Sequence, residues 1–394
     1  MAQPLPTRHP QRPRPVPPAI RLFALALGLR EPDAAEFRRL GECLLVADAP
    51  ADRLVDWMHT VGMSRSRPMF EQALREGVDS VGELRPGDAP LRAFFAEVET
   101  VPDWVDRDRL RSAARVMRSG GADGLYIARD VALLGGYMFA GFNQTLLRTG
   151  ALEKGSNKRF AETSQWAIDV ISDGGLEPGG VGYRSTVRVR LIHAMVRRHI
   201  ASMDDWDASA WGVPINQTDM AATLVGALVA PTVGGVGMGI VNRPNEYEAV
   251  AHLTRYVGWL IGVQDEFLPT SFRDAIRVLL HTSCALSTPD ATTRQLAMPM
   301  VEDPLSWHYR TLPGLRRWLA RSQHLGITGA FLGPRAMRVL GLPVLTVPWY
   351  PLIRTPVNAV RSAAALLPGG RGRAAERGRR EQASFMRTMT GVGG

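Results

Sequence analysis

The sequence is poor in the residues that build cross-linked scaffolds and cysteine-ligated metal sites. It has two cysteines, Cys43 and Cys284, among 394 residues, which is too few for a disulfide framework and gives no pair at metal-binding spacing. HExxH, GxSxG and Walker motifs are missing, so zinc-protease, nucleophile-elbow and P-loop chemistry are not predicted. Lysine occurs only at Lys154 and Lys158. The formal net charge of +9 therefore rests on arginine, and we predict no nucleic-acid partner from it.

Sustained alternation of apolar and polar residues is also missing, which argues against strands. Helical periodicity dominates instead, and it predicts an all-α protein. The predicted helices cover 34–47, 50–62, 68–75, 90–99, 107–118, 123–148, 158–172, 185–202, 218–230, 245–262, 270–284 and 313–325. No clear linker interrupts them, so we predict a single large helical domain over residues 34–340.

The two ends differ in composition from this domain. Residues 1–33 are rich in proline and arginine, and we expect a disordered arm there that leads into a first helix. Residues 341–394 join an apolar, proline-rich segment to a basic tail that we also expect to be disordered. The uncharged run 220–242 is long enough for a membrane span, but its proline and glycines favour two buried half-helices joined by a glycine turn. We expect a cytoplasmic location, with peripheral membrane contact through the C-terminal region.

One predicted helix carries a histidine between two arginines. Arg190, His193 and Arg197 stand at i, i+3 and i+7, so they share one helix face. A neutral imidazole is a common iron ligand, and a haem also needs cations for its propionates, which the planar fork of arginine suits. The alternative is a structural histidine beside solvent-facing arginines, and the spacing alone favours that alternative.

The preceding helix carries a second polar face. Arg159, Glu162, Thr163 and Trp166 stand at i, i+3, i+4 and i+7. A carboxylate beside a reactive metal can act as acid or base, and a hydroxyl can orient a bound oxygen species. The alternative is an Arg159–Glu162 ion pair on a solvated face with Trp166 in the core. For these residues alone, the alternative is favoured.

Taken in order, these pieces resemble the family that unites MpaB-type oxygenases with latex clearing protein, the rubber oxygenase. The pieces are Arg159-x-x-x-Thr163, the glycine-rich stretch 174–182, and Arg190-x-x-His193-x-x-x-Arg197. The resemblance spans most of residues 35–335. No single piece is highly specific, but the ordered set is fairly specific.

The resemblance implies a haem b protein with a globin-like helical core. His193 would be the proximal axial ligand of the haem iron. Arg190 and Arg197 would support the haem propionates or brace the helix that carries the ligand. Arg159 and Thr163 would lie on the distal or propionate side. The implied reaction is O₂-dependent cleavage of a carbon–carbon double bond in an isoprenoid-like chain, which leaves carbonyl ends.

Two departures from the rubber-cleaving members bear on the substrate. Those members have a lysine directly before the threonine, whereas this chain has Glu162 at that position. They also have a glutamate near the end of the preceding helix, whereas this chain has Gly-Phe-Asn-Gln at 141–144. We therefore expect Glu162 to act as distal acid or base, and a small apolar molecule rather than polyisoprene as substrate. Two other hypotheses are a haem-binding sensor or carrier without oxygenase activity, and a protein that binds anionic membrane surfaces.

Overall fold

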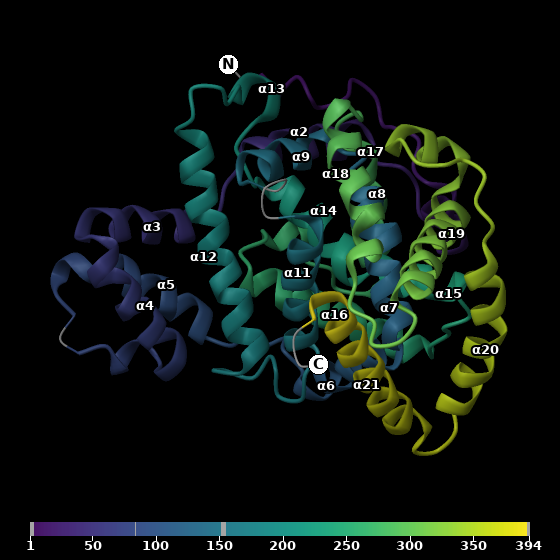
Figure 1. Cartoon of the computed structure of the whole chain (residues 1–394). Helices are drawn as coiled ribbons and strands as arrows, with labels where there is room; N and C mark the ends of the chain where they lie inside the picture. The colour runs from purple at the N-terminus through teal and green to yellow at the C-terminus, as the bar shows by residue number, and fades with distance from the viewer. Residues whose placement is uncertain (1–3, 83, 151–154, 392–394) are drawn as a thin grey trace.

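The computed structural model describes residues 4–82, 84–150 and 155–391, and every regular element in that part of the chain is helical. The predicted all-α class is confirmed. Figure 1 shows α3, α4 and α5 projecting from one side of a larger body, with α12 running between the two.

The helices follow one another in this order: α1 (Pro18–Ala26), α2 (Ala34–Glu42), α3 (Ala49–Val61), α4 (Met63–Glu76), α5 (Ala89–Glu99), α6 (Arg107–Ser119), α7 (Gly121–Ile127), η4 (Ala128–Leu133, a π-helix), α8 (Leu134–Gly136), α9 (Ala140–Arg148), α11 (Ser156–Val170), α12 (Val181–Ala201), α13 (Ala208–Trp211), α14 (Gln217–Leu228), α15 (Ala230–Gly237), α16 (Pro244–Leu260), α17 (Phe272–Ala285), α18 (Ala291–Glu302), α19 (Pro313–Leu340), α20 (Trp349–Ala365) and α21 (Gly370–Thr390).

Local sequence explains where several of these helices begin. Asp33 caps α2, because its carboxylate accepts hydrogen bonds from the backbone of Ala35 and Glu36 while the Glu36 side chain reaches back to the cap. Ser271 caps α17 in a similar way through the backbone N–H of Asp274. These signals explain why the predicted and observed starts differ by only a few residues.

Two large hydrophobic cores hold most of the molecule together, and a small third cluster joins Ala24 of α1 to Leu280 and Cys284 of α17. The larger one joins α2–α6 to α12, α14, α16 and α17, and its α4–α5 part contains three packed rings, Phe70, Phe94 and Phe95. The second joins α7, η4, α11, α18, α19 and α21, and includes the buried side chains of Trp307, Leu134 and Met337. α11 and α12 pack against each other along the boundary, since α11 contributes Phe160 to the second core and α12 contributes Val187 to the first.

The predicted helix over 123–148 is not continuous. It is divided into α7, the π-helix η4, α8 and α9, and Tyr137–Phe139 connect the last two. A π-helical turn inserts an extra residue and is common at functional sites. Hydrophobic periodicity cannot distinguish this interruption from a regular α-helix, because both keep one apolar face toward the core.

The uncharged run near 220–242 forms α14 and α15. The stretch Gln217–Gly237 is long and apolar enough by length and composition to cross a membrane, and 44% of its most apolar window is buried. α14 packs on α16 and α17, which fits a core helix of a folded domain. The two half-helices are as expected, but they are not joined by a glycine turn. The break between them falls at Val229, ahead of Pro231, because proline has no N–H to donate to the next helical hydrogen bond.

Both ends differ from the disorder we expected. The N-terminal arm leads into α1, and within the arm Arg8 forms an ion pair of 2.7 Å with Asp219 of α14. The C-terminal tail forms α20 and α21, and α21 buries Phe385 and Met389 against the second core. A stripe of small and apolar residues runs along α21 between its arginines and explains why this basic segment can fold.

Candidate functional site

The glycine-rich stretch 174–182 allows α11 and α12 to pack as a close antiparallel hairpin. A side chain at Gly182 would place its Cβ 2.6 Å from the carbonyl oxygen of Asp169 and 2.6 Å from the Cα of Val170. Trp166 of α11 donates a hydrogen bond of 3.0 Å from Nε1 to Thr186 Oγ1 of α12. Both contacts give the same antiparallel register, which brings residue 159 about level with residue 193 along the helix axes.

His193 lies on α12 with a buried nitrogen and no hydrogen bond. Its Nδ1 is buried, and neither ring nitrogen has a hydrogen-bond partner in the part of the chain that the structure describes. Burial, with a smaller contribution from the charge of Arg197, lowers the pKa of His193 to about 4, so the ring is neutral at physiological pH. A buried structural histidine is normally hydrogen-bonded, whereas an iron ligand needs a neutral ring with a free nitrogen. These features fit a ligand better than a structural residue.

Arg190, one turn before His193, is bound by two carboxylates. It is 2% exposed and donates to both oxygens of Asp48, from Nε at 2.6 Å and from Nη2 at 2.8 Å. Nη2 also donates to Glu97 Oε1 at 2.8 Å. Asp48 directly precedes α3, and Glu97 belongs to α5, so Arg190 fastens α12 to the projecting three-helix unit.

Arg197 makes a similar attachment one turn after His193. It pairs with Asp52 of α3 and donates to the carbonyl oxygens of Pro214 and Ile215, each at 3.1 Å. The resemblance gave the two arginines two alternative roles, and these contacts match the second one, which is to brace the helix that carries the histidine. Their guanidinium donors are largely used in doing so, although Nη1 of Arg190 is buried without a partner.

Glu162 and Thr163 on α11 are exposed, and Arg159 is partly exposed. No ion pair joins Arg159 to Glu162, and the Glu162 carboxylate has no hydrogen-bond partner among the described residues. The helix therefore does not form the Arg159–Glu162 ion pair that the alternative interpretation predicted. The hydroxyl of Thr163 donates to the carbonyl oxygen of Arg159 at 3.0 Å, which leaves its oxygen free to accept.

Tyr137, which sequence reasoning missed, links Arg159 to the segment around 141–144. Burial raises the pKa of the Tyr137 phenol, and the nearby guanidinium groups of Arg159 and Arg129 partly oppose this rise. The Tyr137 carbonyl oxygen accepts a hydrogen bond of 2.8 Å from Asn143 Nδ2. Asn143 is fully buried, and its Oδ1 has no partner in the described chain. The amide thus stands in the region where the resemblance implies a glutamate.

A buried charged cluster lies beside Tyr137. Arg129 and Asp130 belong to η4 and are 1% and 0% exposed. Arg129 Nη1 donates to Asp130 Oδ1 at 2.7 Å, and Asp130 Oδ2 lies 2.5 Å from His324 Nδ1. Arg129 Nη2 is 3.8 Å from Asp303 Oδ2, and the other oxygen of Asp303 accepts 2.8 Å from Ser156, the first residue of α11. The cluster therefore connects η4 and α19 to the start of the helix that carries Arg159.

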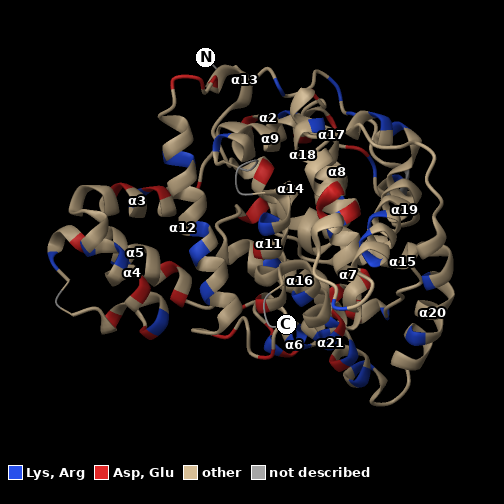
Figure 2. Ribbon diagram, viewed as in Figure 1, with Lys and Arg blue, Asp and Glu red and all other residues tan. Residues whose placement is uncertain are grey.

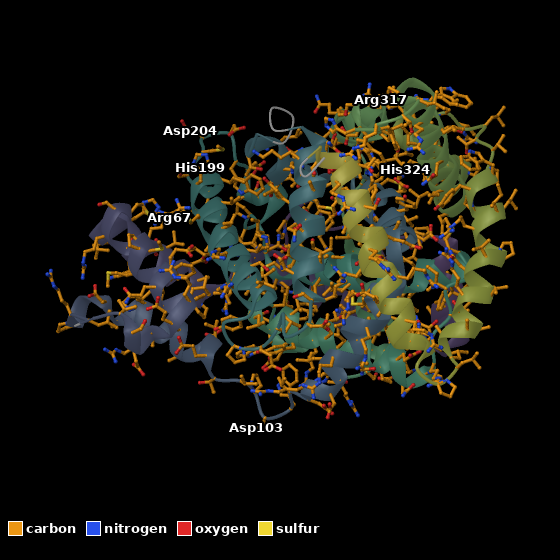
Figure 3. All side chains as sticks on the ribbon, turned by 60° about the horizontal axis from the view of Figure 1, so that its bottom comes forward. Arg67, Asp103, His199, Asp204, Arg317 and His324 are labelled. Carbon is orange, nitrogen blue, oxygen red and sulfur yellow. The ribbon has the colours of Figure 1, made fainter. Side chains whose placement is uncertain are left out.

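Burial raises the pKa of Asp303 to about 6 in this cluster, against the opposing effect of Arg129. His324 is a core residue whose partner is the buried carboxylate of Asp130. The adjacent Arg129–Asp130 pair within an otherwise apolar helix was the available sequence signal, because two buried charges need partners from elsewhere. Figure 3 shows His324 well separated from His199, which lies near the end of α12.

This arrangement offers one ligand-type imidazole rather than a cage for a bare metal ion. Across residues 4–82, 84–150 and 155–391, no group of three or more His, Cys, Asp or Glu side chains could hold a metal ion. A haem needs only an axial ligand from the protein and polar groups for its edge. The free nitrogen of His193 fits that requirement.

The comparisons with known proteins agree with the fold and with the resemblance. The family model described as ER-bound oxygenase mpaB/B'/Rubber oxygenase, catalytic domain, matches residues 125–367. The chain belongs to this family. The matched range contains all six predicted site residues, and it leaves the bracing carboxylates Asp48 and Asp52 outside.

Two known proteins are similar to this chain. The rubber oxygenase of Streptomyces sp. (strain K30) is 24% identical over 191 residues, which are 48% of this chain and 46% of that protein. The chain thus aligns with less than half the length of this relative. The structure of latex clearing protein in the closed state matches 86% of this chain and 91% of its own with a TM-score of 0.67 and 18% identity. That likeness shows a shared fold.

Proposed function

We propose that this protein is a haem b-dependent oxygenase that uses O₂ on a small, apolar, unsaturated isoprenoid-like substrate. The observation that carries the proposal is His193, a neutral histidine with an unpartnered buried nitrogen on a helix fastened at both neighbouring turns. Membership of an oxygenase family supports the reaction class. Haem iron would supply the binding and activation of O₂.

Each site residue has a defined task in this proposal. His193 holds the iron, while Arg190 and Arg197 keep its helix in place through α3. Glu162 holds and transfers a proton at its carboxylate, which is free of ion pairs in the described chain. Thr163 offers a hydroxyl oxygen on the same exposed face of α11, one residue further along.

Arg159 is assigned to the edge of the cofactor site. Its guanidinium lies near Tyr137 and about level with His193, and it has no carboxylate partner among the described residues. An arginine at this level without a carboxylate partner can bind a propionate, because its planar fork matches a carboxylate. Arg190 and Arg197, which already bind carboxylates of the protein, are less available for that task.

Oxygen uptake by the purified haem-loaded protein tests the proposal. Squalene is an unsaturated isoprenoid, and squalane is its saturated counterpart of nearly the same shape. We expect uptake with squalene only, and carbonyl products by mass spectrometry. Glu162→Gln should retain the haem spectrum and lose about 10²-fold or more in rate, as expected for loss of an acid or base.

The competing function is a haem-binding sensor or carrier of the same fold. A haem-loaded protein that consumes no O₂ with squalene or with shorter isoprenoid alkenes would favour this alternative. Equal uptake with squalene and squalane would contradict the assignment of an unsaturated substrate. A Glu162→Gln variant with unchanged rate would remove Glu162 from the reaction.

A further inference from the structure

Helix α20 is built with its polar side facing the protein. Tyr350, Arg354 and Asn358 all bind the buried carboxylate of Asp123 on α7. The shortest contacts are 2.6 Å from the Tyr350 hydroxyl and from Arg354 Nη2, and 2.8 Å from Asn358 Nδ2. A surface helix of a water-soluble domain normally faces the core with its apolar side. α20 has the opposite orientation, and its hydrogen bonds fix it in that orientation.

The apolar side of α20 faces outward. Leu352, Ile353 and Val360 are 69%, 59% and 72% exposed. The connection before α20 continues this surface with Leu345 and Val347, which are 96% and 71% exposed. Single exposed apolar residues are ordinary, but a continuous group of large ones marks an interaction surface.

The beginning of α19 adds a tryptophan to the same surface. Trp349 at the start of α20 donates a hydrogen bond of 3.1 Å to Ser322 Oγ of α19. Trp318, which is 61% exposed, lies one turn before Ser322 and so on the same side of α19. We call the surface formed by Trp318, Leu345, Val347, Leu352, Ile353 and Val360 the α19–α20 apolar face.

The charge of this region has a single sign. Residues 304–375 contain ten arginines and no aspartate or glutamate. The formal net charge of the whole chain is +9, so the remainder of the chain is close to neutral. Figure 2 shows α20 banded in blue without red. Six arginines of this stretch have no carboxylate partner in the described chain: Arg310, Arg316, Arg317, Arg335, Arg338 and Arg373.

We propose that the α19–α20 apolar face docks on the surface of a membrane that contains anionic lipid. Large apolar side chains enter the headgroup–acyl boundary, tryptophan favours that boundary, and arginines bind lipid phosphates while their stems stay apolar. A second copy of this chain fits less well, because a symmetric contact would bring two acid-free arginine surfaces together. The proposal does not depend on haem or on oxygenase activity. It would place an enzyme for apolar molecules where such molecules dissolve.

Vesicle flotation with the full-length protein tests the docking. The probes are phosphatidylcholine vesicles with and without phosphatidylserine. We expect binding to the anionic vesicles and much less to the neutral ones, with a further decrease at high salt. The variant Leu352→Glu/Val360→Glu changes only exposed side chains and should lose binding. The control Thr60→Glu/Val181→Glu adds the same charge at exposed positions on α3 and α12 and should retain it.

A second pair of variants tests the arginines. Each basic residue near an anionic surface strengthens binding about fivefold, so Arg316→Gln/Arg335→Gln should weaken it by up to about 25-fold. The exposed pair Arg53→Gln/Arg67→Gln on α3 and α4 is the control and should change binding little. Unchanged binding of Leu352→Glu/Val360→Glu would overturn the proposal. A failure of the wild-type protein to bind anionic vesicles would also overturn it. That conclusion would hold if the protein stayed monomeric, and equally if it formed a dimer that Leu352→Glu/Val360→Glu dissociates.

Discussion

The role of Arg190 can be decided by changing its partner rather than Arg190 itself. Asp48→Asn removes the carboxylate that accepts two of its hydrogen bonds, at 2.6 and 2.8 Å, while both side chains are almost fully buried. Breaking a buried ion pair on one side costs about 3–5 kcal/mol, because the remaining charge stays buried. Glu97 still accepts from Arg190 at 2.8 Å. We therefore expect a loss of about 2–3 kcal/mol in the free energy of unfolding.

Urea unfolding at neutral pH measures this loss, and the chain offers a matched control. Asp56 lies on α3 one turn after Asp52 and pairs with Arg198 of α12, but both side chains are well exposed, at 64% and 49%. Asp56→Asn should cost less than about 1 kcal/mol, as is usual for a surface pair. Equal effects of Asp48→Asn and Asp56→Asn would refute the claim that buried carboxylates hold α12 against α3.

The same variants separate the two roles that the resemblance implied for Arg190. If Arg190 acts by bracing the helix of His193, Asp48→Asn and Arg190→Gln should weaken haem retention to a similar extent. If Arg190 itself binds a propionate, Arg190→Gln should weaken retention far more than Asp48→Asn. Haem transfer to apomyoglobin gives the dissociation rate for both. The structure predicts similar rates.

The remaining predictions concern Asp303 and Gly182. Burial raises the pKa of Asp303 to about 6, so the folded protein keeps a proton that the unfolded chain releases near pH 4. The free energy of unfolding should therefore fall by up to about 3 kcal/mol as the pH rises from about 4 to about 6. Unfolding curves of Asp303→Asn should lack this contribution. An identical pH dependence in wild type and Asp303→Asn would contradict the assignment. Gly182→Ala would place a Cβ 2.6 Å from Asp169 and Val170 and should destabilise the protein by about 1–3 kcal/mol, whereas Gly372→Ala, in open space on α21, should be neutral or slightly stabilising. Equal stability of the two alanine variants would show that α11 and α12 do not approach as closely as described.

Most helices were predictable because their signals are local. The predicted 107–118 and 245–262 correspond to α6 and α16 within one or two residues at either end. α21 was not predicted, since its arginines conceal a stripe of small and apolar residues, and its Gly378 packs against the backbone of Arg118 in a distant helix. Such a contact cannot be read from local composition.

The candidate site was predictable in part. The helix spacing placed Arg190, His193 and Arg197 on one face, and the structure keeps them there. The partners of the two arginines, Asp48 and Asp52, stand more than 140 residues earlier, and nothing in the spacing identifies them. Sequence spacing gives the face of a helix, while the fold decides what that face meets.

The absorption spectrum of the protein purified from haem-supplied cells tests the central claim most directly. His193→Ala and His199→Ala are matched variants on one helix, since His199 is exposed near its end. The account predicts a Soret band in the wild type and in His199→Ala that is lost or strongly shifted in His193→Ala. A colourless wild-type protein, or an unchanged spectrum in His193→Ala, would contradict it.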